Sequence, residues 1–193
     1  ATPFNVIGEN GFRISGITFA GGSASNAIFI NKGGTGSITG WRIDHCHFKD
    51  ITQRGISVGA FASASDYARD WPGLIDNNRF SAPGRFKAIQ VYGGSFTPHG
   101  DWDDELVLGG PDFLFIENNY FVPSAMIEGV SSIDGDTGGR TVFRHNTFIN
   151  GDISFHGVET AIALPWRSSH GCESYNNSFL STVSHVFQIN VRG

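Results

Sequence analysis

The strongest enzyme-like group of residues lies between positions 134 and 156. It contains two carboxylates, Asp134 and Asp136, followed by Arg140 and His156. Two carboxylates with an arginine and a histidine could carry out acid–base chemistry on a glycosidic bond or at C5 of a uronate. The Asp-Gly-Asp segment is also an ordinary turn sequence, so a structural role is the alternative interpretation.

A second acidic segment predicts either a site for a hard cation such as Ca²⁺ or a solvated acidic loop. Its carboxylates are those of Asp101, Asp103, Asp104 and Glu105. Ca²⁺ takes several oxygen ligands, but the segment lacks the fixed spacing of a known calcium loop. The histidines form no zinc pattern, because no cysteine pair accompanies them. We therefore predict no cofactor, with Ca²⁺ as the alternative.

Three of the four tryptophans, Trp71, Trp102 and Trp166, fall in long polar segments. Each indole is either a stacking platform for a ligand or a plug packed against the base of its own loop. Nearby strand segments would add a second set of ligand-binding side chains, namely Gln90, Tyr92, Glu128 and His156. Aromatic rings beside such hydrogen-bonding groups suit a long polyhydroxylated chain. The alternative is ordinary solvated strand surface.

The elements that must position these side chains recur along the chain. Six short strand-like segments end in Phe19, Phe48, Phe80, Phe121, Phe148 and Phe179, which are 27 to 41 residues apart. A period in this range indicates stacked supersecondary units. In most of the segments, Asn or His occupies the place where the chain would bend. Asn tolerates left-handed backbone geometry and bonds nearby backbone groups, so we expect stacked Asn and Phe ladders.

A second strand with period-two alternation is predicted after each of these segments. The expected ranges are 27–30, 55–58, 88–92, 125–128, 152–155 and 186–189. Ile89 and Val91 should face inward, and Gln90 and Tyr92 outward. Long loops should follow at 60–72, 93–112, 131–140 and 157–171 and gather on one flank. The pattern predicts an all-β chain, a right-handed parallel β-helix of six to seven turns.

Composition limits the organisation and the partners. The 193 residues, with a net charge of −5 and no basic run, predict one domain that binds neither nucleic acid nor anionic membranes. Both ends look cut, so we expect a module (1–193) of a longer polypeptide. Cys46 and Cys172 lie four units apart, roughly 19 Å at ~4.8 Å per strand. They should be free thiols, because a disulfide needs Cα atoms within about 7 Å.

The segment Trp41-Arg-Ile-Asp-His-Cys46 resembles the Trp-Ile-Asp-His segment of pectate lyases. The Asn-Asn and Phe turns resemble the pectin-lyase-like superfamily of right-handed β-helices. The segments around Phe148 and Phe179 are similar to uncharacterised bacterial β-helix repeat proteins. Some modules of this kind are attached to xylan-degrading enzymes and bind polysaccharide without cutting it. The resemblance implies an extracellular or cell-surface location and a carbohydrate-active enzyme domain in the same polypeptide.

Three functional hypotheses follow. The first is a non-catalytic module that binds a plant cell-wall polysaccharide such as xylan. The second is a polysaccharide lyase or glycoside hydrolase that uses Asp134, Asp136, Arg140 and His156. The third is a structural segment of a larger surface protein. The exposed end turns of a β-helix also offer unpaired backbone groups, so an end-to-end dimer is a further expectation.

Overall fold

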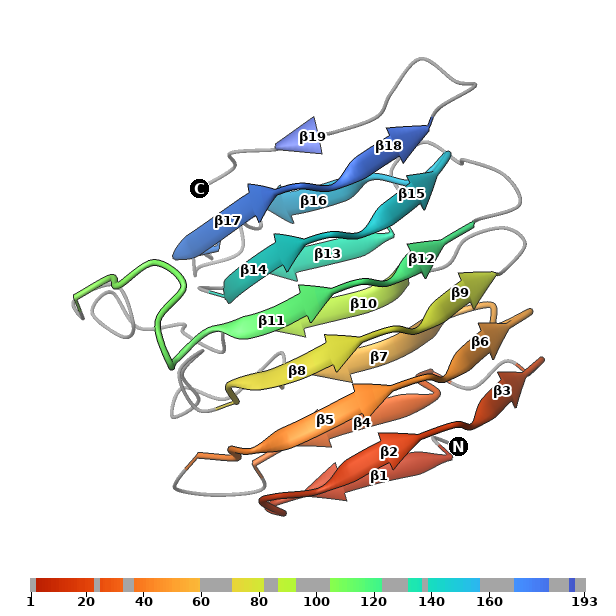
Figure 1. The fold of residues 1–193 in the computed structure, drawn as a ribbon. Coiled ribbons are helices and arrows are strands. Elements are labelled where there is room, and N and C mark those ends of the chain that lie inside the picture. The colour runs from red at the N-terminus through yellow and green to blue at the C-terminus, as the bar shows by residue number, and fades with distance from the viewer. Residues whose placement is uncertain are drawn as a thin grey trace, which may run out of the picture.

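The computed structural model describes residues 3–22, 25–32, 37–59, 71–81, 87–92, 105–122, 132–136, 139–156, 169–180 and 188–189. They form a right-handed parallel β-helix of about six turns, in which three parallel sheets run along the axis (Figure 1). Sheet A has seven strands, and sheets B and C have six each. The predicted fold class is confirmed.

Each turn contributes one strand to each sheet. Sheet A contains β1 (Phe4–Ile7), β4 (Ile28–Asn31), β7 (Arg54–Val58), β10 (Lys87–Tyr92), β13 (Ile133–Asp136), β16 (Ile153–His156) and β19 (Gln188–Ile189). Sheet B contains β2 (Arg13–Ser15), β5 (Trp41–Asp44), β8 (Gly73–Asp76), β11 (Leu114–Glu117), β14 (Arg140–Arg144) and β17 (Gly171–Tyr175). Sheet C contains β3 (Thr18–Ala20), β6 (His47–Lys49), β9 (Arg79–Ser81), β12 (Tyr120–Phe121), β15 (Thr147–Ile149) and β18 (Ser178–Leu180).

The recurring phenylalanines form a single stack inside the helix. The ring pairs from Phe19 to Phe179 are nearly parallel, with centroids 4.6 to 4.9 Å apart. Parallel strands in register place equivalent residues one strand spacing apart, so one Phe per turn becomes a continuous column. At the first turn the rings of Phe4 and Phe19 meet in a T-shaped contact, with the ring planes 79° apart. The predicted Phe ladder is confirmed.

Two neighbouring positions at the bend between sheets B and C have different roles. The first position has left-handed backbone geometry, with φ between 52° and 57° at His45, Asn77, Asn118, His145 and Asn176. These side chains are exposed. The second position carries the buried amide ladder. The backbone N–H of Asn78 donates to Asn119 Oδ1 at 2.9 Å, and Asn119 Nδ2 donates to the carbonyl of Ile75 at 2.8 Å.

Sheet A buries a column of isoleucines. Ile28, Ile56, Ile89, Ile133 and Ile153 are successive Cα partners, and each is fully buried. The next inward column includes Val91, which is 1% exposed. The inward orientation predicted for Ile89 and Val91 is therefore confirmed. β-Branched side chains suit this pleated, buried surface.

One strand prediction was wrong for the fourth turn. The strand of sheet A that lies between β10 and β16 is β13, at Ile133–Asp136, where the sequence predicted a loop. The predicted segment 125–128 lies outside the described residues. The other five predicted second strands overlap β4, β7, β10, β16 and β19. The error arose because Asp-Gly-Asp in β13 has the composition of a turn.

The two cysteines are free thiols, as predicted, and Cys46 is buried. Among the residues described above, no helix has the length and apolar character needed to cross a bilayer.

Candidate functional site

The outward column of sheet A is a buried polar network. Gln90 and Asp134, which are Cα partners, are each 1% exposed. Gln90 Nε2 donates to Asp134 Oδ2 at 2.8 Å, and the ammonium of Lys87 forms an ion pair with the same oxygen. Ser57 and Ser154 in the same column are also buried. The amide nitrogen of Gln90 is thus engaged by Asp134 and its side chain is buried, so the predicted role of Gln90 in ligand binding stays a prediction.

Trp71 is a plug, which corrects its prediction as a stacking residue. Its side chain is 1% exposed and belongs to the hydrophobic core. A Cβ added at Gly59, which has φ of 83°, would lie 2.6 Å from Trp71 Cζ2. The indole therefore fills the space beside a glycine. Tyr92, at the end of β10, is half-buried, whereas Trp102, Trp166 and Glu128 lie outside the described residues.

The four predicted catalytic residues are divided between two sheets. Asp134 and Asp136 lie in β13 and His156 in β16 of sheet A, and Asp136 and His156 are Cα partners. For these last two residues only the backbone is described. Arg140 lies in β14 of sheet B, 3% exposed, with Nη1 3.9 Å from Asp112 Oδ2 and Nη2 3.4 Å from His170 Nδ1. The structure thus brings Asp136 next to His156 along the sheet and places Arg140 in another sheet.

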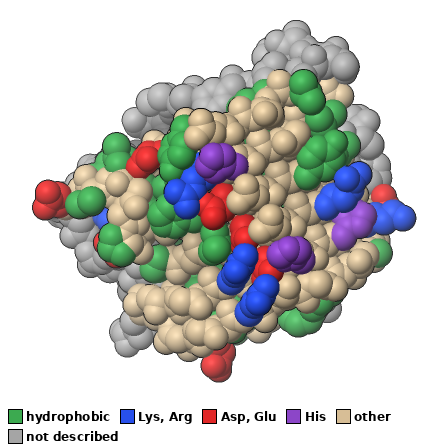
Figure 2. All heavy atoms as spheres, in the orientation of Figure 1, with side chains coloured by type: hydrophobic (Ala, Val, Ile, Leu, Met, Phe, Trp, Pro, Cys, Tyr) green, Lys and Arg blue, Asp and Glu red, His purple; other side chains and the backbone are tan. Residues whose placement is uncertain are grey.

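Sequence reasoning missed a ladder of ion pairs on the outer face of sheet B. Arg13 makes two hydrogen bonds to Asp44, at 2.7 and 2.6 Å, and Arg42 makes two to Asp76, at 2.8 and 2.5 Å. Arg144 forms an ion pair with Glu117, its Cα partner on the preceding turn. Each pair joins neighbouring turns. Figure 2 shows basic, acidic and histidine side chains gathered along the middle of this face.

The carboxylates of this ladder have a spacing that could do chemistry, but Asp44 is in the wrong protonation state for the role of an acid. Asp44, Asp76 and Glu117 are successive Cα partners, so they stand about one strand spacing, ~4.8 Å, apart. Retaining glycosidases hold two carboxyl groups at about 5–5.5 Å, one of them protonated. Here the hydrogen bonds from Arg13 hold the pKa of Asp44 well below its usual range. Asp44 therefore has no proton to donate.

The motif that resembles the pectate lyases has structural roles in this chain. Trp41 and Ile43 are in the core. The side chain of Asp44 is fully buried and accepts from Arg13, while His45 occupies the left-handed bend with its Nδ1 2.6 Å from Asp44 Oδ2. Through these contacts the motif forms a corner of the β-helix and holds two neighbouring turns together.

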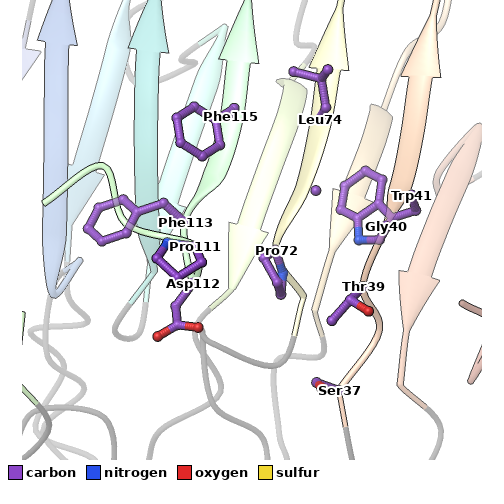
Figure 3. A pocket seen from close by; sticks show the side chains of 11 residues that line it. Ser37, Thr39, Gly40, Trp41, Pro72, Leu74, Pro111, Asp112, Phe113 and Phe115 are labelled. Atoms are coloured by element: carbon purple, nitrogen blue, oxygen red, sulfur yellow. The ribbon is translucent and has the colours of Figure 1, made fainter. Parts of the chain in front are cut away.

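A groove of about 530 Å³ crosses the start of β5, β8 and β11 (Figure 3). It is lined by residues 39–41, 72–74 and 111–113, with Ser37 and Phe115. We call this the sheet-B groove. Leu74 and Phe115, which are Cα partners on the outer face of sheet B, are half-buried and present apolar side chains to it. Trp41 and Phe113 are 2% and 1% exposed and form its floor.

The rims of the groove have defined supports. On one side, Thr39 N–H donates to Asn10 Oδ1 at 2.7 Å. On the other, the segment 105–113 folds back on itself, with Gly110 N–H donating to the Val107 carbonyl at 3.0 Å. Phe115 is held by Arg144, whose Cζ lies 5.1 Å from the ring centroid, a cation–π geometry. The apolar surface is thus built on strands and fixed by contacts on both sides.

A sequence signal for this groove does exist. Arg13, Arg42, Leu74, Phe115, Val142 and Glu173 occupy equivalent positions in successive strands of sheet B. The outward column changes from Arg to three apolar residues, Leu74, Phe115 and Val142, and ends in Glu173. Aligning the repeats on their closing Phe would have shown this apolar run at an outward position.

Within the described part of the chain, no group of three or more His, Cys, Asp or Glu side chains is arranged to hold a metal ion. Of the acidic segment predicted as a Ca²⁺ alternative, Asp101, Asp103 and Asp104 lie outside the described residues, and Glu105 is exposed. Comparison with known proteins found no matching family model, curated protein or solved structure.

Proposed function

We propose that this chain is a non-catalytic module that binds a plant cell-wall polysaccharide such as xylan in the sheet-B groove. The observation that carries the proposal is the pair of outward apolar residues, Leu74 and Phe115, side by side over a floor that includes Trp41. Sugar rings present C–H groups on their faces, which pack on apolar and aromatic side chains. Their hydroxyl groups can meet the polar rim formed by Ser37, Thr39 and Asp112.

The geometry of the groove suits a polymer better than a small molecule. It crosses three parallel strands, so its length follows the axis of the β-helix. Small-molecule sites bury most of their ligand in an enclosed cleft, whereas this groove is open to solvent. A chain of sugar rings can lie along such a groove and contact it ring by ring.

Affinity-gel electrophoresis tests the proposal. The chain should be retarded by at least one of three polysaccharides in the gel, namely xylan, pectin or mixed-linkage glucan, and not by a gel without polysaccharide. Phe115→Ala should reduce the retardation. Full mobility in all three gels would contradict the proposal.

Cleavage is the competing proposal, supported by the adjacent backbone positions of Asp136 and His156. It predicts new reducing ends or an unsaturated product that absorbs in the ultraviolet after incubation with the same polysaccharides. His156→Ala should abolish either signal. If the chain is joined to a carbohydrate-active enzyme at the cell surface, binding alone would hold that enzyme on its polymer.

A further inference from the structure

We infer that the sheet-B groove selects a neutral polysaccharide and rejects polyuronates, and that Asp112 is a specificity-determining residue. This inference rests on the proposed function. The carboxylate of Asp112 lies at the rim of the groove, next to Pro111 (Figure 3), and its side chain is 54% exposed. A polymer that lies in the groove therefore passes close to a solvated negative charge.

The described cations around the groove are all engaged by carboxylates. Arg42 is bound to Asp76, Arg144 to Glu117, and buried Arg140 lies beside Asp112 itself. Recognition of a uronate carboxylate calls for a guanidinium or ammonium that can bind it directly. Here such groups would first have to leave their partners. A uronate in the groove would gain no strong partner from this part of the chain.

A second acid lies on the same side of the groove as Asp112. The carboxylate of Glu173 touches the segment 105–113, because a Cβ at Gly109 would lie 3.0 Å from Glu173 Oε1. Glu173 is only partly buried, and the whole chain carries a net charge of −5. Like charges placed opposite each other suppress binding of the wrong partner, and salt screens that repulsion.

Two forms of one polymer isolate this charge effect. Polygalacturonate carries a carboxylate on each sugar, and highly methyl-esterified pectin has the same backbone with most of that charge removed. Together with unsubstituted xylan they form the ligand panel, at low and at high salt. In low salt we expect the neutral polymers to bind at least about tenfold more tightly than polygalacturonate. The ratio of the affinity for the neutral polymers to the affinity for polygalacturonate should fall as the salt concentration rises.

The matched variants are Asp112→Asn and Asp50→Asn. Their side chains are similarly exposed, 54% and 55%. Asp50, however, comes directly after strand β6 of sheet C and does not line the groove. Asp112→Asn should strengthen polygalacturonate binding at least about threefold and leave xylan binding unchanged, and Asp50→Asn should alter neither. Because Asp112→Asn also changes the surroundings of Arg140, Glu173→Gln provides a second variant with the same expected direction.

The outcomes separate the two claims. Equal or tighter binding of polygalacturonate would overturn the selectivity and leave the proposed function standing. Equal effects of the Asp112 and Asp50 variants would overturn the role of Asp112. Absence of binding to every polymer in the panel and to mixed-linkage glucan would overturn the proposed function and this inference with it.

Discussion

The indole of Trp41 lies against the backbone of Gly73, its Cα partner on the next turn. A Cβ added at Gly73 would be 2.1 Å from Trp41 Cε2 and 2.5 Å from Cδ2. On its other side, Trp41 stacks on Phe12 with the ring planes 6° apart. Because Gly73 has no side chain, it leaves the space that the indole of Trp41 occupies. The position of Trp41 in the floor of the sheet-B groove therefore depends on this glycine.

Gly73→Ala should destabilise the fold by about 1–3 kcal/mol, the usual cost of forcing extra atoms into a packed core. Denaturant unfolding measures the change. Trp41→Leu removes the indole that would clash, so the double variant should lose less stability than the sum of the two single changes. Strict additivity would show that the two residues do not share this space.

The two asparagines of one bend should respond differently to substitution. Asn119→Leu leaves the buried N–H of Asn78 and the carbonyl of Ile75 without their amide partner. Each lost partner costs about 1–3 kcal/mol, so the free energy of unfolding should fall by about 2–6 kcal/mol. The control is Asn118→Gly, at an exposed position with φ of 55°, which should stay within about 0.5 kcal/mol of the parent. Equal losses in the two variants would contradict the ladder.

Asp44 should make stability fall at acidic pH. Arg13, His45 and Ser15 hydrogen-bond its carboxylate and lower its pKa in the folded state. The stabilisation is therefore fully present above the unfolded pKa, near 4, and is lost as the pH falls from there towards the folded pKa. Asp44→Asn should lower the melting temperature at pH 7 and reduce its further decrease below pH 4. If the melting temperatures of Asp44→Asn and of the parent decreased equally across this pH range, Asp44 would not be the cause of the loss of stability.

Both thiols should be unreactive in the folded protein. Burial raises the pKa of Cys172 to about 12 and also raises the pKa of Cys46. Because the thiolate is the reactive form, Ellman's reagent at pH 8 should titrate neither cysteine rapidly before unfolding and both after it. If the native protein rapidly released one equivalent of thionitrobenzoate from the reagent, one of the two thiols would be accessible in the folded state.

The repeat itself was readable from the sequence because it depends on residues that have the same role in every turn. One Phe per turn builds the stack, and one Asn in each of four successive turns, Asn78 to Asn177, builds the ladder, so both recur at equivalent places. The strand β13 was not readable. It carries Gly135 where neighbouring turns have Val91 and Phe155, because Phe155 and Ser169 occupy the space of a Cβ there, at 2.7 and 2.8 Å.

The candidate site was less predictable, because its partners are far apart in the sequence. Arg13 and Asp44 meet only when the chain completes one turn, and the spacing of turns varies with loop length. The outward residues of sheet A looked like a binding face, yet Gln90 and Asp134 are buried and hydrogen-bonded to each other. Alternation predicts which way a side chain points, but not whether another segment covers it.

Phe115 in the sheet-B groove should contact the polysaccharide directly, and Tyr120 offers a matched control for this contact. Both rings lie on the fourth turn and are partly exposed, and each has an arginine Cζ 5.1 Å from its centroid. Isothermal titration with soluble xylan should show at least about tenfold weaker binding for Phe115→Ala, a loss typical of a binding hot spot. Tyr120→Ala should bind as the parent does. Unchanged affinity of Phe115→Ala, or equal losses in both variants, would show that the sheet-B groove is not where the polysaccharide binds.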